Sequence, residues 1–149
     1  SNQVYQEAYT CPCLKVHPHG EQFVAQSNGN YICIFSTRPP YKLNKKRVAE
    51  NPDHSNMNIP DLAVPFELKA FEGHTVAGFN IGCDISPDGM LVASGSAEGG
   101  VYFYDWNSTA RQQILRTGHQ GATTDVAFHP LLPRMVASSG WDGSIILHE

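Results

Sequence analysis

A histidine, a serine and an acidic residue occur together twice in this chain, in a combination that a hydrolase could use. The two sets are His74, Ser94 and Glu98, and then His119, Ser138 and Asp142. In a hydrolase the acid orients the histidine, which takes the proton from the serine nucleophile. An active site has no reason to be duplicated, yet the second set follows the first after 44 or 45 residues. We therefore predict that both sets are buried, hydrogen-bonded structure, that the chain has no catalytic residues and that it is not an enzyme.

The segments that must hold these side chains repeat at the same interval. Strand-like runs end at His17-Pro18, Ser86-Pro87 and His129-Pro130, and the second and third of these are 43 residues apart. The pairs Gly73-His74 and Gly118-His119 precede the second and third runs. Self-similarity at about 40–45 residues is typical of the blades of a β-propeller. The interval therefore predicts a binding scaffold.

Each repeat is expected to contain short strands separated by turns, and no window sustains the apolar period of a helix. The expected strands of the second repeat are residues 80–85, 90–94, 101–104 and 112–116. The third repeat has three, at 123–128, 135–139 and 145–149, and the weaker first repeat has 13–16, 23–26 and 31–35. The predicted fold class is all-β: a partial propeller of about three four-stranded antiparallel blades whose ring is not closed.

The spacing also predicts the division of the chain. The first and second Pro-containing motifs are 69 residues apart, which is 26 more than the later interval. The excess falls in a polar segment with three prolines. The expected units are a degenerate first blade over 1–47, an insertion over 48–70, a second blade over 71–117 and a third blade over 118–149 that lacks its fourth strand.

Several alternatives stay open in this region. Residues 41–47 and 66–71 compete for the fourth strand of the first blade. We expect the insertion to be mobile, because a long exposed loop costs little closure entropy, but it could also dock through Leu62, Val64 and Phe66 or reflect an error in the coding sequence. Three blades cannot close a ring, so we expect a fragment of a larger, seven-bladed protein or a self-associating half-propeller.

Bulk composition narrows the range of ligands. The net charge of −4 argues against general binding to nucleic acid or an anionic membrane, and no run approaches the roughly 20 apolar residues of a membrane span. The four cysteines are expected to be buried free thiols: Cys11, Cys13, Cys33 and Cys83. Cys11 and Cys13 lie near His17 and His19, but no second ligand pair follows, so we predict no metal and no cofactor. We also predict no small-molecule substrate.

Two surface features could contact a partner. The basic stretch 38–47 could bind RNA phosphates and stack a base through Arg38, Tyr41, Lys42, Lys45, Lys46 and Arg47. The alternative is a solvated edge strand, where lysines discourage aggregation. Trp141 follows the second strand of the third repeat, where it could anchor a protein partner or pack on the neighbouring blade.

The order of these motifs resembles the WD-repeat family. The resemblance rests on Gly73-His74, the Pro-Asp-Gly turn at 87–89, Tyr104-Asp105, Gly118-His119 and Asp142-Gly143. It implies that a buried hydrogen-bonded chain forms in each of the last two blades, through His74, Ser94, Glu98 and Tyr104, and through His119, Ser138, Asp142 and His148. Tyr104 and His148 stand where the family usually has Trp, and Glu98 stands where it has Asp.

The stretches 41–47, 71–79 and 139–143 resemble one subgroup of that family, which contains WD repeat-containing protein 25 and the second-step pre-mRNA splicing factor of the Prp-seventeen type. This resemblance implies a nuclear, spliceosome-associated scaffold that binds proteins. The alternative function is an RNA-contacting module that uses the basic stretch.

Overall fold

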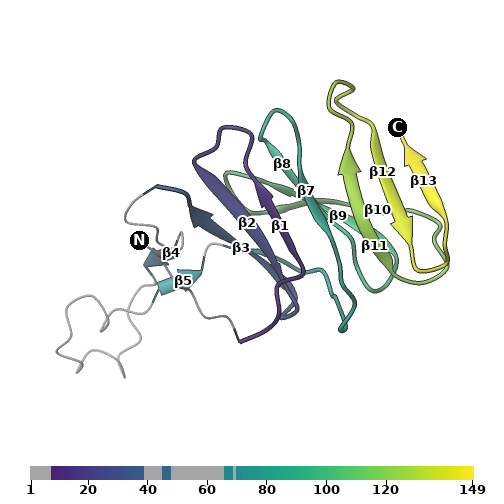
Figure 1. Ribbon diagram of the computed structural model, residues 1–149, viewed down its shortest axis with the longest axis horizontal. Coiled ribbons are helices and arrows are strands. Elements are labelled where there is room, and N and C mark those ends of the chain that lie inside the picture. Colours follow the sequence, from purple (N-terminus) through teal and green to yellow (C-terminus); the bar gives the residue numbers. More distant parts are fainter. Residues whose placement is uncertain (1–7, 39–44, 48–65, 69) are drawn as a thin grey trace.

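Three antiparallel sheets, each built from strands that follow one another in the chain, lie side by side like the blades of a fan (Figure 1). The computed structural model describes residues 8–38, 45–47, 66–68 and 70–149. Over these ranges the chain contains strands and turns but no helix. The sheets hold three or four strands and none of them closes on itself. The predicted all-β class is confirmed.

Blade 2 has four strands in the order β10-β9-β8-β7. Its strands are β7 (Cys83–Ile85), β8 (Leu91–Ser94), β9 (Gly100–Asp105) and β10 (Arg111–Arg116). The turn between β7 and β8 is closed by Asp88, which accepts from the Ser86 hydroxyl at 2.6 Å and from the Met90 amide at 2.9 Å. Gly89 takes a positive φ of 74° there, which glycine adopts without strain.

Blade 3 repeats this order with three strands, β11 (Thr123–Phe128), β12 (Val136–Gly140) and β13 (Ile145–His148). Blades 2 and 3 are joined through the backbone as well as through side chains. Ser96 and Thr123 exchange two hydrogen bonds, at 3.1 and 2.9 Å, and the Gly82 amide donates to the Thr124 carbonyl at 2.7 Å. The two sheets are therefore held in a fixed register where they meet.

Blade 1 is completed by a strand from beyond the insertion. It contains β1 (Cys13–Val16), β2 (Gln22–Ser27), β3 (Tyr31–Ser36) and, paired with β3, the strand β6 (Ala70–Glu72). The structure thus ends the first blade later than residue 47 and begins the second after residue 72. The reason is the fully buried Phe71, whose ring centroid lies 5.6 Å from that of Tyr104 and 5.9 Å from that of Trp106.

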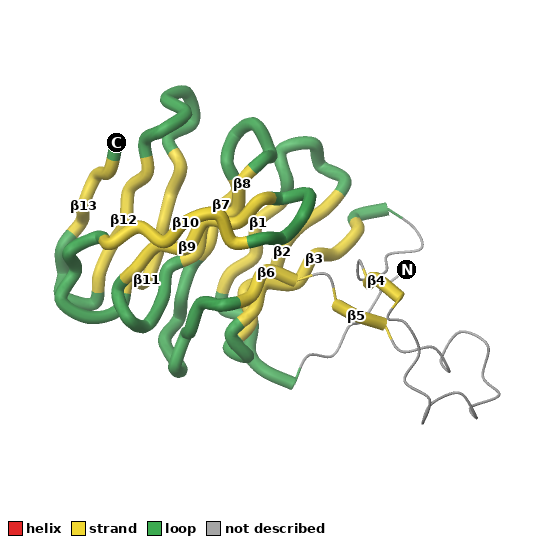
Figure 2. Tube along the Cα trace, turned by 180° about the vertical axis from the view of Figure 1, so that it is seen from behind, coloured by secondary structure: helices red, strands yellow, loops and turns green. Residues whose placement is uncertain are grey.

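Of the two segments that competed for this position, 66–71 supplies the strand through its last residues, Ala70 and Phe71, while its first residues pair with the other candidate. β4 (Lys45–Arg47) and β5 (Phe66–Leu68) form a separate two-stranded ladder beside blade 1 (Figure 2). Residues 48–65 lie outside the described residues, and the expectations of a mobile or docked insertion, including those for Leu62 and Val64, stay predictions.

The larger apolar core lies between blades 1 and 2. It contains buried side chains from both sheets, among them Val24, Ile32, Ile34, Val92 and Tyr104. A smaller cluster of Ala93, Val101 and Val126 lies between blades 2 and 3. Burial of each large apolar side chain stabilises the fold by about 1.5–3 kcal/mol. These contacts hold the polar groups described next at fixed positions.

Candidate functional site

A buried chain of hydrogen bonds crosses the interface between blades 1 and 2. The Tyr104 hydroxyl lies 2.9 Å from His74 Nδ1, and His74 Nε2 lies 2.7 Å from Gln26 Oε1. The amide nitrogen of Gln26 donates to Ser94 Oγ at 2.7 Å, and the Ser94 hydroxyl donates to the Gly95 carbonyl at 2.8 Å. Every member of this chain therefore has its partners, although Gln26 and Ser94 are fully buried.

The partners define the protonation of the ring. An amide oxygen only accepts, so His74 Nε2 carries the proton that it donates to Gln26, and Nδ1 accepts from Tyr104. A protonated ring would lose the bond at Nδ1. In agreement with this assignment, burial lowers the pKa of His74 to about 4. The negative charge of Glu98 acts in the opposite direction and raises this pKa, but its effect is smaller. The histidine is thus a neutral structural group at physiological pH.

Glu98, which the resemblance placed in this chain, lies elsewhere. Its carboxylate accepts from the Thr75 hydroxyl at 2.6 Å and from the Tyr102 hydroxyl. The Tyr104 hydroxyl already occupies Nδ1 of His74, so that nitrogen has no proton to donate to an acid. Glu98 therefore ties the hairpin turn of blade 2 to the loop that precedes the blade.

Blade 3 contains a second chain of hydrogen bonds. It connects the four predicted residues and includes one more, Ser144. His148 Nε2 lies 2.9 Å from Ser138 Oγ, which lies 2.8 Å from His119 Nε2. On the other side of the ring, His119 Nδ1 lies 2.7 Å from Ser144 Oγ, whose hydroxyl donates to Asp142 at 2.6 Å. Proton donation thus runs in one direction, from His148 toward the carboxylate of Asp142.

Asp142 is held as a charged acceptor. The Gln120 amide donates to it at 2.7 Å and the Ser144 amide at 3.0 Å, while His119 Nδ1 lies 3.4 Å away. These bonds, that of the Ser144 hydroxyl first, keep the pKa of Asp142 well below its usual range. Although His119, Ser138 and Asp142 are the residue types of a hydrolase, Ser138 is only 2 % exposed. A substrate carbonyl could not approach its hydroxyl.

The two chains differ because the neighbouring blade differs. Gln26 precedes Ser27 at the hairpin of blade 1, and the residue at the same place in blade 2, before Ser96, is Gly95. A Cβ atom on Gly95 would lie 2.2 Å from the Thr123 carbonyl oxygen, so no side chain fits there. His119 consequently bonds Ser138 directly, whereas Gln26 inserts its amide between His74 and Ser94.

Sequence reasoning missed three buried residues at the interface between blades 1 and 2, which are His17, Gln26 and Trp106. His17 Nε2 lies 3.0 Å from the Gly89 carbonyl, and its ring centroid is 4.4 Å from that of Trp106. The signal for His17 was its place in the first Pro-containing motif. A polar Gln26 directly after a run of apolar residues was the signal for an unusual buried amide.

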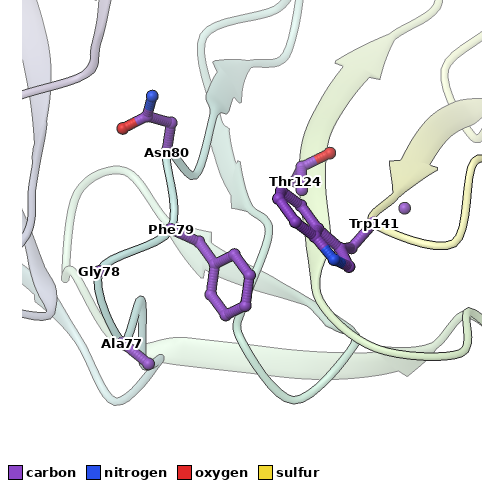
Figure 3. A pocket seen from close by; sticks show the side chains of 7 residues that line it. Ala77, Gly78, Phe79, Asn80, Thr124 and Trp141 are labelled. Carbon is purple, nitrogen blue, oxygen red and sulfur yellow. The ribbon is translucent and has the colours of Figure 1, made fainter.

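The exposed aromatic residue of blade 3 lies over an open pocket of about 670 Å³ (Figure 3). The Trp141 side chain is 71 % exposed, and its ring meets that of Phe79 edge to face with 5.4 Å between centroids. Phe79 follows two residues with positive φ, Ala77 at 45° and Gly78 at 81°, which turn the chain so that the Phe79 ring lies beside that of Trp141. The pocket is lined by Ala77, Gly78, Phe79, Asn80, Thr124, Gly140 and Trp141.

The basic stretch is described only in part. Arg38 is exposed and forms an ion pair with Glu21 at 2.8 Å. Lys45, Lys46 and Arg47 form β4, while Tyr41 and Lys42 lie outside the described residues. Contact of this stretch with RNA stays a prediction. Reversing the charges of Lys45 and Lys46 would test it, because a phosphate-binding site would lose salt-dependent RNA affinity.

The cysteines depart from expectation in one respect. Cys33 and Cys83 are buried, but Cys13 is half-buried and Cys11 is exposed, so the prediction that all four are buried was wrong. Cys11 precedes β1, and its thiol donates to the Tyr9 carbonyl at 4.0 Å. Within the described part of the chain, no three His, Cys, Asp or Glu side chains are grouped so as to hold a metal ion. The same residues contain no helix long and apolar enough to span a membrane.

Comparison with known proteins agrees with this architecture. WD repeat-containing protein 25 of Mus musculus is 35% identical over 97% of this chain, and Pre-mRNA-processing factor 17 of Homo sapiens is 29% identical over 95%. The U5 small nuclear ribonucleoprotein 40 kDa protein of Homo sapiens is 37% identical over 48% of the chain. The chain spans only 20 to 23% of the length of these relatives.

A solved structure shows the same fold. The structure described as "Crystal structure of RRP9 WD40 repeats" superposes with a TM-score of 0.67 at 18% identity, over 97% of this chain and 36% of that one. The profile of the family described as "WD domain, G-beta repeat" matches residues 66–105 and 111–149. These two matches cover more than half of the sequence, and the chain therefore belongs to the WD-repeat family.

Proposed function

We propose that this chain is part of a non-enzymatic scaffold that binds proteins in a nuclear, spliceosome-associated assembly. The observation that carries the proposal is the similarity to Pre-mRNA-processing factor 17 over 95% of the chain. A shorter match to the U5 small nuclear ribonucleoprotein 40 kDa protein supports the same setting. WD-repeat sheets are rigid, so partners are expected to bind the loops and turns between the strands.

Within this scaffold, we infer that the pocket between Phe79 and Trp141 contacts a protein partner. An exposed tryptophan beside a second aromatic ring offers a large apolar surface that loses little conformational entropy on binding. Tryptophan is also among the residues that contribute most to binding energy at interfaces. Asn80 and Thr124 line the same pocket and add hydrogen-bonding groups beside the rings.

The test is affinity purification of the full-length protein from nuclear extract, followed by quantitative mass spectrometry. We expect splicing proteins to co-purify with the wild type. Trp141→Ala should reduce their recovery about 10-fold or more, the loss typical of an anchor residue. Leu131→Ala is the matched control, because Leu131 is 83 % exposed on a different loop and should leave recovery unchanged.

The two parts of the proposal can fail separately. If no splicing protein is enriched with the wild type, the splicing assignment is wrong. If splicing proteins are recovered equally with wild type and Trp141→Ala, the assembly is right and the pocket is not the contact site.

A further inference from the structure

Two thiols meet where β1 of blade 1 lies beside β7 of blade 2. Cys13 begins β1 and Cys83 begins β7, and these two strands lie side by side in both views (Figures 1 and 2). The Cys83 thiol donates to the Cys13 sulfur across 3.7 Å, and the Cys83 amide donates to the same sulfur at 3.5 Å. The residues are 70 positions apart in the sequence, so this contact joins two repeats.

The distance is short enough for the sulfurs to bond. A disulfide bond is about 2.05 Å long, so each sulfur needs to move by less than about 1 Å to close the gap of 3.7 Å. Small rotations about the side-chain torsions supply such a movement, and Cys13 has room for it because it is only half-buried. The backbones of β1 and β7 are already adjacent.

The environments of the two sulfurs are unequal. The hydrogen bond from the Cys83 thiol, with that from its amide and the charge of Lys15, lowers the pKa of Cys13 to about 6 against the effects of burial and of Asp125. The same thiol contact and complete burial raise the pKa of Cys83. A half-buried thiolate reacts with an oxidant before a buried thiol does.

We propose that Cys13 and Cys83 are a redox pair that forms a reversible disulfide between blades 1 and 2, with hydrogen peroxide as the oxidant. The Cys13 thiolate attacks one peroxide oxygen, the O–O bond breaks, and a sulfenic acid and hydroxide form. The Cys83 sulfur then attacks the Cys13 sulfur, and the S–O bond breaks as the S–S bond forms. The departing hydroxide takes the Cys83 proton as water, and the two electrons lost by the thiols have reduced the peroxide.

The bond would change how the blades are held together. At present the hydrogen bonds of Gln26 and His17 and the apolar core join blades 1 and 2. A covalent link between residues so far apart restricts the unfolded chain strongly. Because the link lowers the entropy of the unfolded chain, oxidation is expected to stabilise the fold and to raise the melting temperature by about 5–10 °C.

The experiment treats the full-length protein with stepwise hydrogen peroxide, blocks remaining thiols and maps peptides by mass spectrometry without reduction. We expect a peptide containing Cys13 linked to one containing Cys83, released again by dithiothreitol. Cys13→Ser and Cys83→Ser should each abolish this link and the rise in melting temperature. Cys11→Ser is the control, because Cys11 is exposed and two residues away, and it should retain both.

Three results would overturn the proposal. One is oxidation of Cys13 to a sulfinic acid while Cys83 stays a thiol. Another is a link that joins Cys13 to Cys11 or Cys33. The third is a melting temperature that rises equally in Cys13→Ser, which would show that other oxidation causes the effect.

Discussion

Replacing Gln26 with leucine removes the one side chain that completes the polar chain of blade 2 from outside that blade. Leucine has a similar volume, so the substitution removes hydrogen bonds without leaving a large cavity. The His74 Nε2–H loses its acceptor, and Ser94 Oγ loses a donor while it still donates to the Gly95 carbonyl. Because water does not reach these groups, nothing replaces the lost amide.

The magnitude follows from these two losses. A buried donor left without an acceptor costs about 1–3 kcal/mol, and the loss of a neutral hydrogen bond at a group that keeps another partner costs about 0.5–1.5 kcal/mol. Gln26→Leu is therefore expected to lower the free energy of unfolding by about 2–4 kcal/mol. Gln113→Leu is the matched control on the exposed strand β10 and should change it by less than about 0.5 kcal/mol.

Urea denaturation of the full-length protein, followed by circular dichroism, measures both variants against the wild type. The double variant with Ser94→Ala should be less destabilised than the sum of the single variants, because both remove the same bond. If Gln26→Leu is no less stable than Gln113→Leu, the buried amide is not satisfying His74 and Ser94, and the reasoning is wrong.

Three further predictions concern neighbouring groups. The pKa of His74 is about 4 in the folded state and about 6.5 in the unfolded state, so the unfolded state binds more protons between these values. His74 should therefore contribute a fall in stability of at most about 3 kcal/mol as the pH drops from 6.5 to 4, and urea titrations of His74→Asn should lack this contribution. Gly95→Ala should destabilise by about 1–3 kcal/mol, because its Cβ would meet backbone, the Thr123 carbonyl oxygen, at 2.2 Å. Tyr104→Phe should cost about 1 kcal/mol in thermal or urea denaturation, because it removes the donor to His74 Nδ1.

Each of these has its own control. For the pH dependence, an exposed histidine variant, His19→Asn, should keep the wild-type profile, and a His74→Asn profile that is equally steep would contradict the assignment. Gly100→Ala should cost less than Gly95→Ala, because its Cβ would meet the flexible Ile114 side chain at 3.1 Å. A Tyr104→Phe variant as stable as the wild type would mean that His74 Nδ1 needs no donor.

The fold could be predicted because it depends on features that recur. The Pro-containing motif occurs three times, which predicted three blades. Turn residues such as Asp88 and Gly89 indicated where strands end. The fourth strand of blade 1 could not be chosen from the sequence, since 66–71 and 41–47 are both long enough to form it. The choice depends on whether Phe71 can be buried against Tyr104 and Trp106, which is a contact between blades.

The residues of the polar chains were predicted from the resemblance, but their connections were not. The residues around Glu98 do not show that the Tyr104 hydroxyl is hydrogen-bonded to His74 Nδ1, the nitrogen that an acid would otherwise bond. Likewise, Gln26 lies 48 residues before His74, and only the packing of one blade on the next brings the two together. Short-range patterns do not contain such information.

The position of Gln26 also bears on how this protein could be rearranged. The side chain that satisfies the polar groups of blade 2 comes from blade 1, whereas the corresponding residue before blade 3 is Gly95, which has no side chain. A blade 2 transplanted behind another repeat would carry His74 and Ser94 without their amide. Recombination that preserves stability should therefore keep blades 1 and 2 together, with any crossover placed between blades 2 and 3.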